Sequence, residues 1–309
     1  MNLVFCGTPQ FAVPTLETLA NAEFNIRLVL TQPDRPKGRG LELVASPVKQ
    51  SAEKLGLPVQ QPEKIKTNEQ LRTQLESLAA DAIVVVGYGR IIPAWMLEMP
   101  KYGNINLHAS LLPKYRGAAP IQWAIASGEK TTGVTTMRID QGLDTGDTLL
   151  QQELGIFDDD TSETLAPKLA AIGAELMMTT LRELQSETIT PRPQDNEQAT
   201  LAPILKKEDG RIDFSRTAQE IYKRVRAFQP WPGAFTTLRG KMLNITAAKT
   251  AAEKVAERGL LVKGPQLFVG CGGNSSLEIL ELQPEGKKRM PARDFIHGYR
   301  PFDGEPVGG

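Results

Sequence analysis

Residues 82–86 constrain the fold more than any other segment, because Ala82-Ile83-Val84-Val85-Val86 is apolar at every position. Such a run is typical of a central parallel strand that helices cover on both faces. Other short apolar runs alternate with stretches of helical periodicity, at 2–5, 24–31, 104–108 and 132–138, which indicates repeated βαβ units. We therefore expect an α/β domain built on a doubly wound, mostly parallel sheet of the Rossmann-like type.

The C-terminal third has a different pattern. A helical stretch at 161–184 is followed at 186–203 by a polar segment with three prolines, which favours a linker. Beyond it, Thr217 and Glu220 fit a capping box, and short strand-like runs follow at 234–238, 242–248, 260–262, 266–269 and 277–282. Because 309 residues exceed one typical domain, we expect an N-terminal domain at 1–185, a linker at 186–205 and a small β-barrel at 206–309.

Composition narrows the class of protein. No apolar run approaches the ~18 residues that cross a bilayer, and the first residues lack the basic region of an export signal. The two cysteines, Cys6 and Cys271, are too few for a disulfide framework or a cysteine zinc site. A cytoplasmic protein with no membrane partner is expected.

Two common cofactor motifs are missing from the sequence. Gly7 to Ala12, after the first strand, holds one glycine and a proline where dinucleotide sites have G-x-G-x-x-G, and there is no G-x-x-x-x-G-K-[ST] phosphate loop. A nicotinamide cofactor is therefore disfavoured, and an ATP-driven reaction has no support from motifs. The two histidines, His108 and His297, cannot form a multi-histidine cluster in the N-terminal domain, so a metal-free site is expected.

Asn106 and His108 are the candidate site residues of the N-terminal domain. They are two apart on a predicted strand and so project from one face, at the strand end where doubly wound sheets bind ligands. The alternative is that both side chains only tie down the following loop through backbone hydrogen bonds. A second loop, Gly142-Leu143-Asp144-Thr145-Gly146-Asp147, could bring a carboxylate to the same crevice, or could be a simple turn.

Several motifs in order resemble the methionyl-tRNA formyltransferase family. They are Cys6-Gly7-Thr8-Pro9, Thr31-Gln32-Pro33-Asp34-Arg35-Pro36, Asn106-Leu107-His108, Ser110-Leu111-Leu112-Pro113, Arg116 to Gln122, Gly142 to Asp147, Arg211-Ile212-Asp213-Phe214 and Pro230-Trp231-Pro232. The likeness covers nearly the whole chain. It implies a formyltransferase-type catalytic domain, a linker, a C-terminal OB-like barrel, and 10-formyltetrahydrofolate as the one-carbon donor.

The resemblance also assigns roles to residues. Asn106, His108 and Asp144 match the catalytic trio, while the loop residues Ser110, Leu111, Leu112 and Pro113 and the segment with Arg90 and Ile92 match the folate-contacting positions. In formyl transfer an amine attacks the formyl carbon, and the resulting oxyanion needs hydrogen-bond donors. We expect Asn106 and a charged His108 to donate these bonds and Asp144 to favour the charged histidine. Whether His108 or a water is the immediate base is left open.

Charged residues are distributed unevenly along the chain, which bears on a nucleic-acid partner. Residues 1–205 carry 18 Lys and Arg against 24 Asp and Glu, whereas residues 206–309 carry 18 against 12, so the basic excess lies in the C-terminal third. The resemblance makes this part and the basic loop at 33–40 contacts for initiator methionyl-tRNA, although each cation could be only a solvated charge. The expected tRNA contacts are Arg35, Lys37, Arg39, Lys223, Arg224, Arg226, Lys287, Lys288 and Arg289.

The expected activity is transfer of the formyl group from the folate to the α-amino group of initiator methionyl-tRNA in translation initiation, by a monomer. Two rivals stay open. A sugar-nucleotide amine formyltransferase would share the trio and barrel, but the basic pattern at 31–40 favours the tRNA enzyme. A folate- or RNA-binding module without catalysis would retain the fold, but the intact trio argues against it.

Overall fold

The computed structural model describes residues 1–37 and 42–308 and divides into two compact units. Unit 1 comprises residues 1–117, 131–155 and 166–202, and unit 2 comprises 118–130, 156–165 and 203–309. Unit 2 thus takes two segments from the expected N-terminal domain, and unit 1 takes most of the expected linker. The functional boundaries at 185 and 205 stay predictions. Among the described residues, no helix combines the length and the apolar character of a membrane span.

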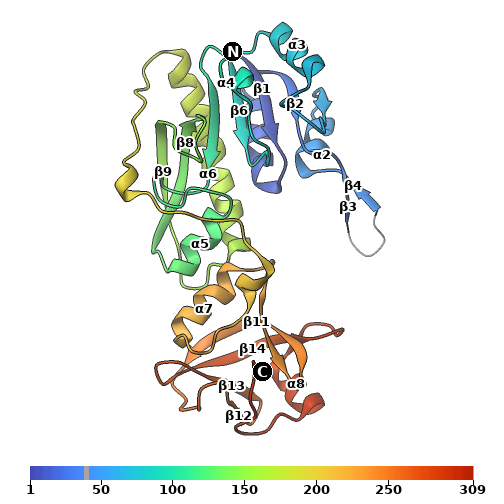
Figure 1. Cartoon of the computed structure of the whole chain (residues 1–309), viewed down its shortest axis with the longest axis vertical. Helices are drawn as coiled ribbons and strands as arrows, with labels where there is room; N and C mark the ends of the chain where they lie inside the picture. The colour runs from blue at the N-terminus through green and yellow to red at the C-terminus, as the bar shows by residue number, and fades with distance from the viewer. Residues whose placement is uncertain (38–41, 309) are drawn as a thin grey trace. The chain divides into compact units, whose positions relative to one another are not determined.

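The core of unit 1 is a seven-stranded sheet (Figure 1). Its order is β5 (Val59–Gln60), β2 (Asn25–Leu30), β1 (Asn2–Gly7), β6 (Ala82–Val86), β7 (Asn104–His108), β8 (Thr131–Arg138) and β9 (Thr148–Gly155). The first five are parallel, whereas β8 and β9 are antiparallel to their neighbours. The expected mostly parallel sheet is confirmed, with β6 fully buried at its centre.

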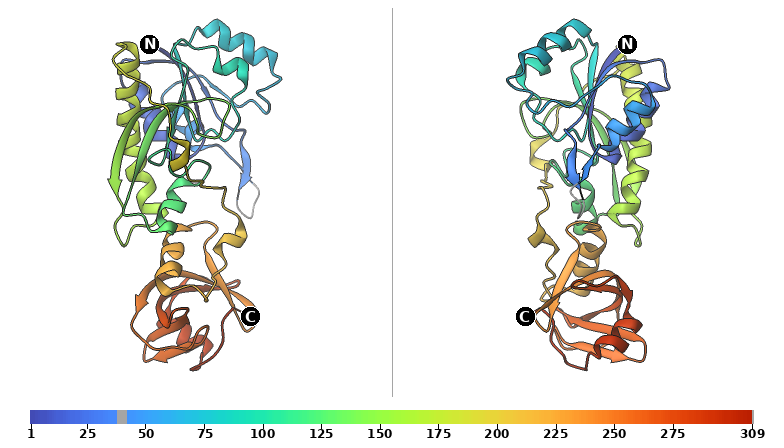
Figure 2. Two further views of the ribbon diagram at one scale, coloured as in Figure 1. Left: turned by 60° about the vertical axis from the view of Figure 1, so that its left-hand side comes forward. Right: turned by 90° about the vertical axis from the view of Figure 1, so that its right-hand side faces the viewer.

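Helices cover both faces of this sheet, as Figure 2 shows. One face packs against α3 (Glu69–Leu78) and α4 (Ala94–Leu97) through a core that includes Val4, Ile83 and Met96. The opposite face carries η1 (Gln10–Ala12), α1 (Val13–Ala20), α2 (Pro47–Lys54) and α6 (Ser162–Gln185). Leu107 of β7 packs against Gly173 of α6. The contact is so close that a Cβ at position 173 would lie 2.7 Å from a Leu107 methyl group. This contact directs Leu107 towards α6.

Three parts of unit 1 depart from the sequence expectation. Strand β9 is an extra edge strand, and the basic segment at 33–40, expected to be a loop, enters a short hairpin of β3 (Arg35–Lys37) and β4 (Glu42–Val44). Residues 192–202 were expected to be part of the linker. They include η2 (Asn196–Gln198), and both ends of the segment form hydrogen bonds to the rest of unit 1. A bridge joins Thr148 to Arg192, and another joins Arg116 to Leu201.

Unit 2 is an antiparallel sheet with helices packed on it (Figure 1). The strands are β10 (Ala234–Leu238), β11 (Lys241–Ala251), β12 (Leu260–Lys263), β13 (Gln266–Cys271), β14 (Ser275–Pro284) and β15 (Met290–Pro291). The helices are α5 (Pro120–Ser127), η3 (Lys207–Gly210), α7 (Ala218–Ala227) and α8 (Ala292–Tyr299). The capping box predicted for α7 is present, with Thr217 and Glu220 bonding each other's backbone N–H. All five strand-like runs are strands.

Candidate active site

Asn106 and His108 lie on one face of β7, near its carboxyl end. Leu107 between them points the other way, into the packing with α6. Asn104 shares their face, and its amide donates 2.9 Å to the Met96 carbonyl at the end of α4. Because alternate residues of a strand share one face, Asn106 and His108 lie on the same face of the sheet as the buried Asn104, which is the face that carries α4.

His108 is held between two loops. Its Nε2 lies 2.9 Å from the Tyr115 carbonyl, which can only accept, so this nitrogen carries a proton. Its Nδ1 lies 3.7 Å from Asp144 Oδ2, and the two side chains are 7% and 20% exposed. His108 thus bonds the backbone of the following loop, which was one of the two alternatives left open by the sequence. It also lies close to a carboxylate.

Asp144 reaches this site from a loop of defined geometry. The loop connects β8 to β9, and the Asp140 carboxylate accepts from Gly142 N at 2.9 Å and from Thr145 Oγ1 at 2.7 Å. Asp144 itself has φ 52°, and its Oδ2 accepts from Gly117 N at 2.8 Å. Asp144 is therefore more than a turn former, because its side chain is directed to His108 and to the loop after β7.

The Asn106 side chain is half-buried, and no described residue is its hydrogen-bond partner. A primary amide of this kind can donate two hydrogen bonds and accept others. An amide donor, an imidazole and a carboxylate thus come together at the edge of a sheet. This set can stabilise an oxyanion and move a proton.

The loop at 110–113 is fixed by residues that sequence reasoning missed. Thr135, opposite His108 in β8 and fully buried, accepts from Leu112 N at 3.1 Å and donates to the Ser110 carbonyl at 2.7 Å. Gln151 of β9 donates to the Leu112 carbonyl at 2.8 Å and to Thr135 Oγ1 at 2.9 Å. Thr135 could have been identified from its position opposite His108, but this position is known only once the register of the antiparallel pair β7 and β8 is known.

Some predicted folate-site side chains are buried in the protein interior. The Ser110 hydroxyl is fully buried and donates 2.6 Å to the Lys114 carbonyl, so this hydroxyl is already used within the loop. Ile92 is buried in the core beneath α4, whereas the neighbouring Ile91 is 92% exposed. Arg90 is half-buried, and its Nε finds no hydrogen-bond partner among the described residues. Of these side chains, Arg90 is left with an unused donor.

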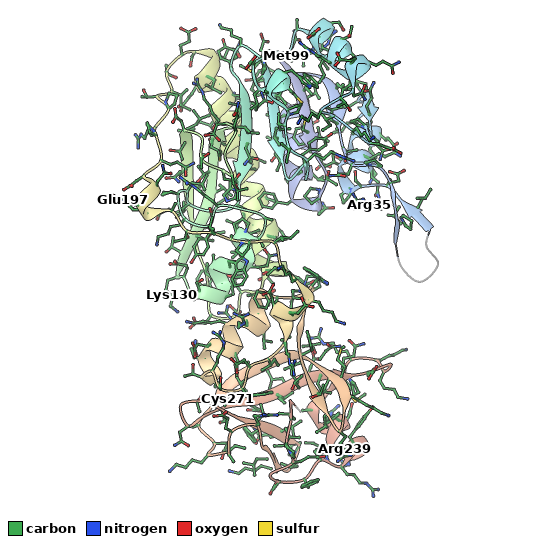
Figure 3. All side chains as sticks on the ribbon, viewed as in Figure 1. Arg35, Met99, Lys130, Glu197, Arg239 and Cys271 are labelled. Atoms are coloured by element: carbon green, nitrogen blue, oxygen red, sulfur yellow. The ribbon has the colours of Figure 1, made fainter. Side chains whose placement is uncertain are left out.

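Two of the three predicted tRNA contacts of unit 1, Arg35 and Lys37, belong to strand β3 of the hairpin. Arg35 is exposed on β3 (Figure 3), with Nη2 3.4 Å from Gln32 Oε1. Lys37 ends β3, and Arg39 lies outside the described residues.

In unit 2, Arg226 of α7 is buried, which differs from the exposed position expected from the sequence, and Arg224 is partly buried. Arg226 is only 8% exposed, stacks on the Tyr222 ring and donates 2.6 Å to the Asp160 carbonyl. Arg224 lies over the Phe228 ring and donates to the Asp209 carbonyl at 3.2 Å, and burial lowers the pKa of its guanidinium. The Arg226 guanidinium is used in internal packing and is not placed for a phosphate contact, whereas a phosphate contact of Arg224 stays a prediction.

The side chains of the other predicted tRNA contacts in unit 2 differ in their exposure to solvent. Lys287 and Lys288 are exposed in the turn between β14 and β15, and Lys223 of α7 is half-buried. Arg289 is exposed but forms an ion pair with Glu281. Lys287 and Lys288 are therefore the better candidates for a polyanion.

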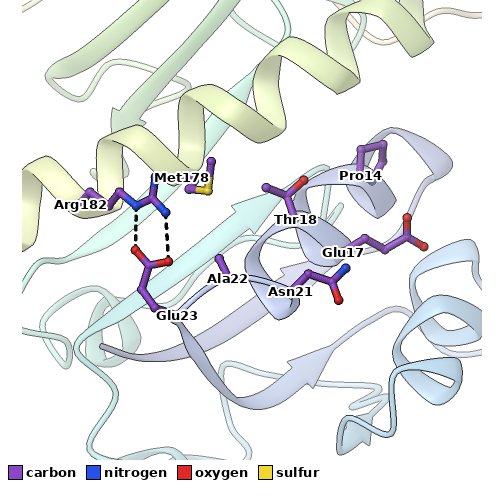
Figure 4. Close-up of a pocket in the computed structure, with 8 residues that line it drawn as sticks. All are labelled: Pro14, Glu17, Thr18, Asn21, Ala22, Glu23, Met178 and Arg182. Carbon is purple, nitrogen blue, oxygen red and sulfur yellow. Dashed lines mark hydrogen bonds and ion pairs between the residues drawn. The ribbon is translucent and has the colours of Figure 1, made fainter.

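Among the described residues, no group of three or more His, Cys, Asp or Glu side chains could hold a metal ion. A surface pocket elsewhere on unit 1 shares no residue with the trio (Figure 4). It is lined by Pro14, Glu17, Thr18, Asn21, Ala22, Glu23, Met178 and Arg182.

The doubly wound sheet and the Asn106, His108 and Asp144 site define a protein of the formyltransferase class: residues 1–181 match the formyl transferase family, and residues 204–300 match the formyl transferase C-terminal domain. The chain is 62% identical over 308 residues to the methionyl-tRNA formyltransferase of Koribacter versatilis, which covers 100% of this chain and 99% of the relative. The relative of the same name from Acidobacterium capsulatum is 62% identical over 300 residues, 96% of each chain. The chain belongs to the methionyl-tRNA formyltransferase family.

Solved structures share the fold at low sequence identity. A methionyl-tRNA formyltransferase from Clostridium thermocellum has a TM-score of 0.57 and 18% identity, covering 82% of this chain and 95% of its own. A sugar 3N-formyl transferase, crystallised with dTDP and 5-N-formyl-THF, has a TM-score of 0.67 and 18% identity, covering 93% and 99%. At these identities the likeness concerns the fold alone.

Proposed function

We propose that this protein transfers the formyl group of 10-formyltetrahydrofolate to the α-amino group of initiator methionyl-tRNA. The observation that supports this most strongly is the approach of Asp144 to His108, on the strand face that also carries Asn106, in a chain 62% identical over its length to relatives named for this activity. The folate supplies the formyl carbon as a co-substrate. The reaction then needs only oxyanion stabilisation and proton transfer from the protein.

Asn106 supplies the first requirement. Its amide N–H groups are not used by any described residue, so they can donate to the oxygen that becomes negative when the amine adds to the formyl carbon. One such donor is worth about 2.7–4 kcal/mol in transition-state stabilisation.

His108 supplies the second donor. Its Nε2–H is held by the Tyr115 carbonyl, and a developing oxyanion competes for this proton because a charged acceptor forms the stronger hydrogen bond. Asp144 Oδ2 lies 3.7 Å from the other ring nitrogen, Nδ1, where it can attract positive charge that develops on the ring during proton transfer. The proton that the amine loses and the proton that the folate nitrogen gains can both pass through His108 or an adjacent water.

Charge supports tRNA as the acceptor. Arg35 is exposed on the hairpin of unit 1, and Lys287 and Lys288 are exposed in unit 2. Lysine and arginine at such positions bind a phosphate backbone without reading its sequence. We place the acceptor end of the tRNA at the hairpin and the tRNA backbone along unit 2.

A direct competition tests the proposal against the sugar-nucleotide alternative, which the similar fold of a sugar formyltransferase keeps open. Purified protein and 10-formyltetrahydrofolate are incubated with initiator methionyl-tRNA in one reaction and with a dTDP-linked amino sugar in another. We expect formylmethionine from the first and no formylated sugar from the second. Formylation of the sugar alone would replace the proposed acceptor.

A further inference from the structure

We propose that Gln194 is a positioning residue of the active site, whose side-chain amide holds the loop that carries Asp144. Its catalytic consequence rests on the function proposed above, whereas its structural part can be measured without any substrate. Gln194 lies in the segment after α6 that the sequence suggests is only a linker, 50 residues from Asp144.

The Gln194 side chain makes four hydrogen bonds. Its Nε2 donates to the Asp144 carbonyl at 2.9 Å and to the Gly146 carbonyl at 2.7 Å. Its Oε1 accepts from Arg116 Nε at 3.0 Å and from Arg116 Nη2 at 2.8 Å. A guanidinium only donates and a carbonyl only accepts, so a single orientation of the amide satisfies all four contacts.

Arg116 links Gln194 to the residues that contact His108 and Asp144. Its side chain is buried, and its two chain neighbours touch the catalytic residues: Tyr115 accepts from His108, and Gly117 donates to Asp144. The amide of Gln194 thus joins the loop after β7 to the loop after β8. Each loop carries one partner of the His108 ring.

Backbone hydrogen bonds anchor Gln194 itself. On one side, Arg192 and Thr148 exchange N–H to O bonds of 2.8 and 2.9 Å, at the start of β9. On the other, Arg116 N donates 2.8 Å to the Thr200 carbonyl and Ala202 N donates 2.7 Å to the Arg116 carbonyl. Pro193 and Asp195 are exposed while Gln194 between them turns inward. Backbone bonds on both sides therefore fix the position from which the Gln194 side chain reaches the two loops.

Positioning matters because Asp144 adopts an uncommon backbone conformation within its loop. Its φ of 52° lies in the left-handed region, which non-glycine residues seldom adopt. Two carbonyls of this loop are fixed by Gln194, and the carboxylate is fixed by Gly117 N. With Gln194 removed, the loop can relax and carry Asp144 away from the 3.7 Å approach to His108 Nδ1.

The first test uses the fact that the protein has only two histidines. The full chain is labelled with ¹⁵N-histidine, and the ring signals are assigned with the His108→Gln variant. Gln194→Glu keeps the acceptor for Arg116 and the size of the side chain but loses the donor to the loop. We expect Gln194→Glu and Gln194→Ala to shift the His108 ring signals and leave those of His297 in α8 unchanged.

The matched control is Gln198→Ala. Gln198 lies in the same segment, but its amide bonds Asp195 and not the Asp144 loop, so we expect both histidines to keep their signals. Unchanged His108 signals in both Gln194 variants would overturn the proposal. So would equal shifts of His108 and His297, because these would indicate a global change.

The second test is kinetic. We expect Gln194→Glu to lower kcat for formylation of methionyl-tRNA by about 10- to 100-fold with little change in KM, as for loss of hydrogen bonds in a charged network. In an Asp144→Ala background the same change should cost less than about twofold, because it acts through Asp144. An equal loss in both backgrounds would contradict a positioning role.

The two proposals fail in different ways. A wild-type protein that formylates no methionyl-tRNA removes the proposed function, and the ring signals still decide the role of Gln194. A wild-type protein that formylates, together with a Gln194→Glu variant of unchanged kcat and unchanged His108 signals, removes the positioning role alone.

Discussion

The Nδ1 atom of His108 lies 3.7 Å from Oδ2 of Asp144, while that same oxygen accepts from Gly117 N at 2.8 Å. The carboxylate is thus bonded to backbone and only near the ring, at a distance beyond a normal hydrogen bond. We expect it to act on His108 as a fixed negative charge. Its orientation depends on the loops on both sides.

Replacing Asp144 by asparagine tests that charge. The asparagine would keep the size of the side chain and tolerate the positive φ, and its amide oxygen could still accept from Gly117 N. Because the negative charge beside His108 is lost, we expect kcat to fall by about 10²- to 10⁴-fold, the range of general acid–base contributions. Steady-state kinetics with saturating folate and methionyl-tRNA measures it. Asp147→Asn, in the same loop, should keep its activity, and an active Asp144→Asn would refute the electrostatic role.

Arg226 should matter for stability and not for tRNA. Arg226→Met removes the donor to the Asp160 and Phe157 carbonyls within unit 2, so we expect the free energy of unfolding to fall by about 1–3 kcal/mol. Urea unfolding measures this. Lys288→Ala, at an exposed position, is the matched control and should leave stability unchanged. Wild-type stability of Arg226→Met with a reduced affinity for tRNA would restore the original expectation from the sequence.

The affinity for tRNA should fall steeply with salt. Each phosphate contact adds a slope of about −0.7 to −0.9 in a plot of log K against log salt concentration. We expect Arg35→Ala, Lys287→Ala and Lys288→Ala each to reduce this slope by about one contact's worth. Filter binding between low and high salt measures it. A slope near zero in the wild-type protein, or slopes unchanged in all three variants, would contradict the assignment.

The Glu23–Arg182 ion pair predicts a pH effect on unit 1. The guanidinium hydrogen-bonds both carboxylate oxygens (Figure 4), and the Arg182 hydrogen bond lowers the pKa of Glu23 from 4.5 to about 2. A depressed folded-state pKa stabilises the fold above the unfolded value and loses this contribution as pH falls. Glu23→Gln should therefore lower Tm at neutral pH, with the difference from wild type shrinking between about pH 4.5 and pH 2.

The pair is largely exposed, with half of each side chain in solvent, so the effect on Tm should be small and should weaken further at high salt. Thermal melts of both proteins at matched ionic strength measure it. A Tm difference that grows as the pH falls would have the wrong sign for this ion pair.

Sequence reasoning succeeded where the physics is local. The bounds of β6 and β7 were predicted correctly, because an uninterrupted apolar run and a two-residue alternation are properties of the segment itself. It failed for β9, whose sequence Thr-Leu-Leu-Gln-Gln-Glu-Leu-Gly reads as polar because this edge strand is half exposed. It also failed for Arg226, since helix charges are normally solvated and this one is covered by another segment of unit 2.

The candidate site was predictable only in part. The shared face of Asn106 and His108 follows from strand geometry, whereas resemblance alone brought in Asp144. Thr135, Gln151 and Gln194 were missed because each acts through partners 16 to 78 residues away, on strands or loops whose register no local pattern specifies.

Single-turnover formylation tests the central claim most directly. Enzyme in excess is mixed with initiator methionyl-tRNA and 10-formyltetrahydrofolate, and formylmethionine is followed over time for the wild type, Asn106→Ala and His108→Ala. We predict rapid formylation by the wild type and a loss of about 10²- to 10³-fold in rate for Asn106→Ala, the effect of removing one oxyanion donor, with a loss at least as large for His108→Ala. Wild-type rates in both variants would contradict the account.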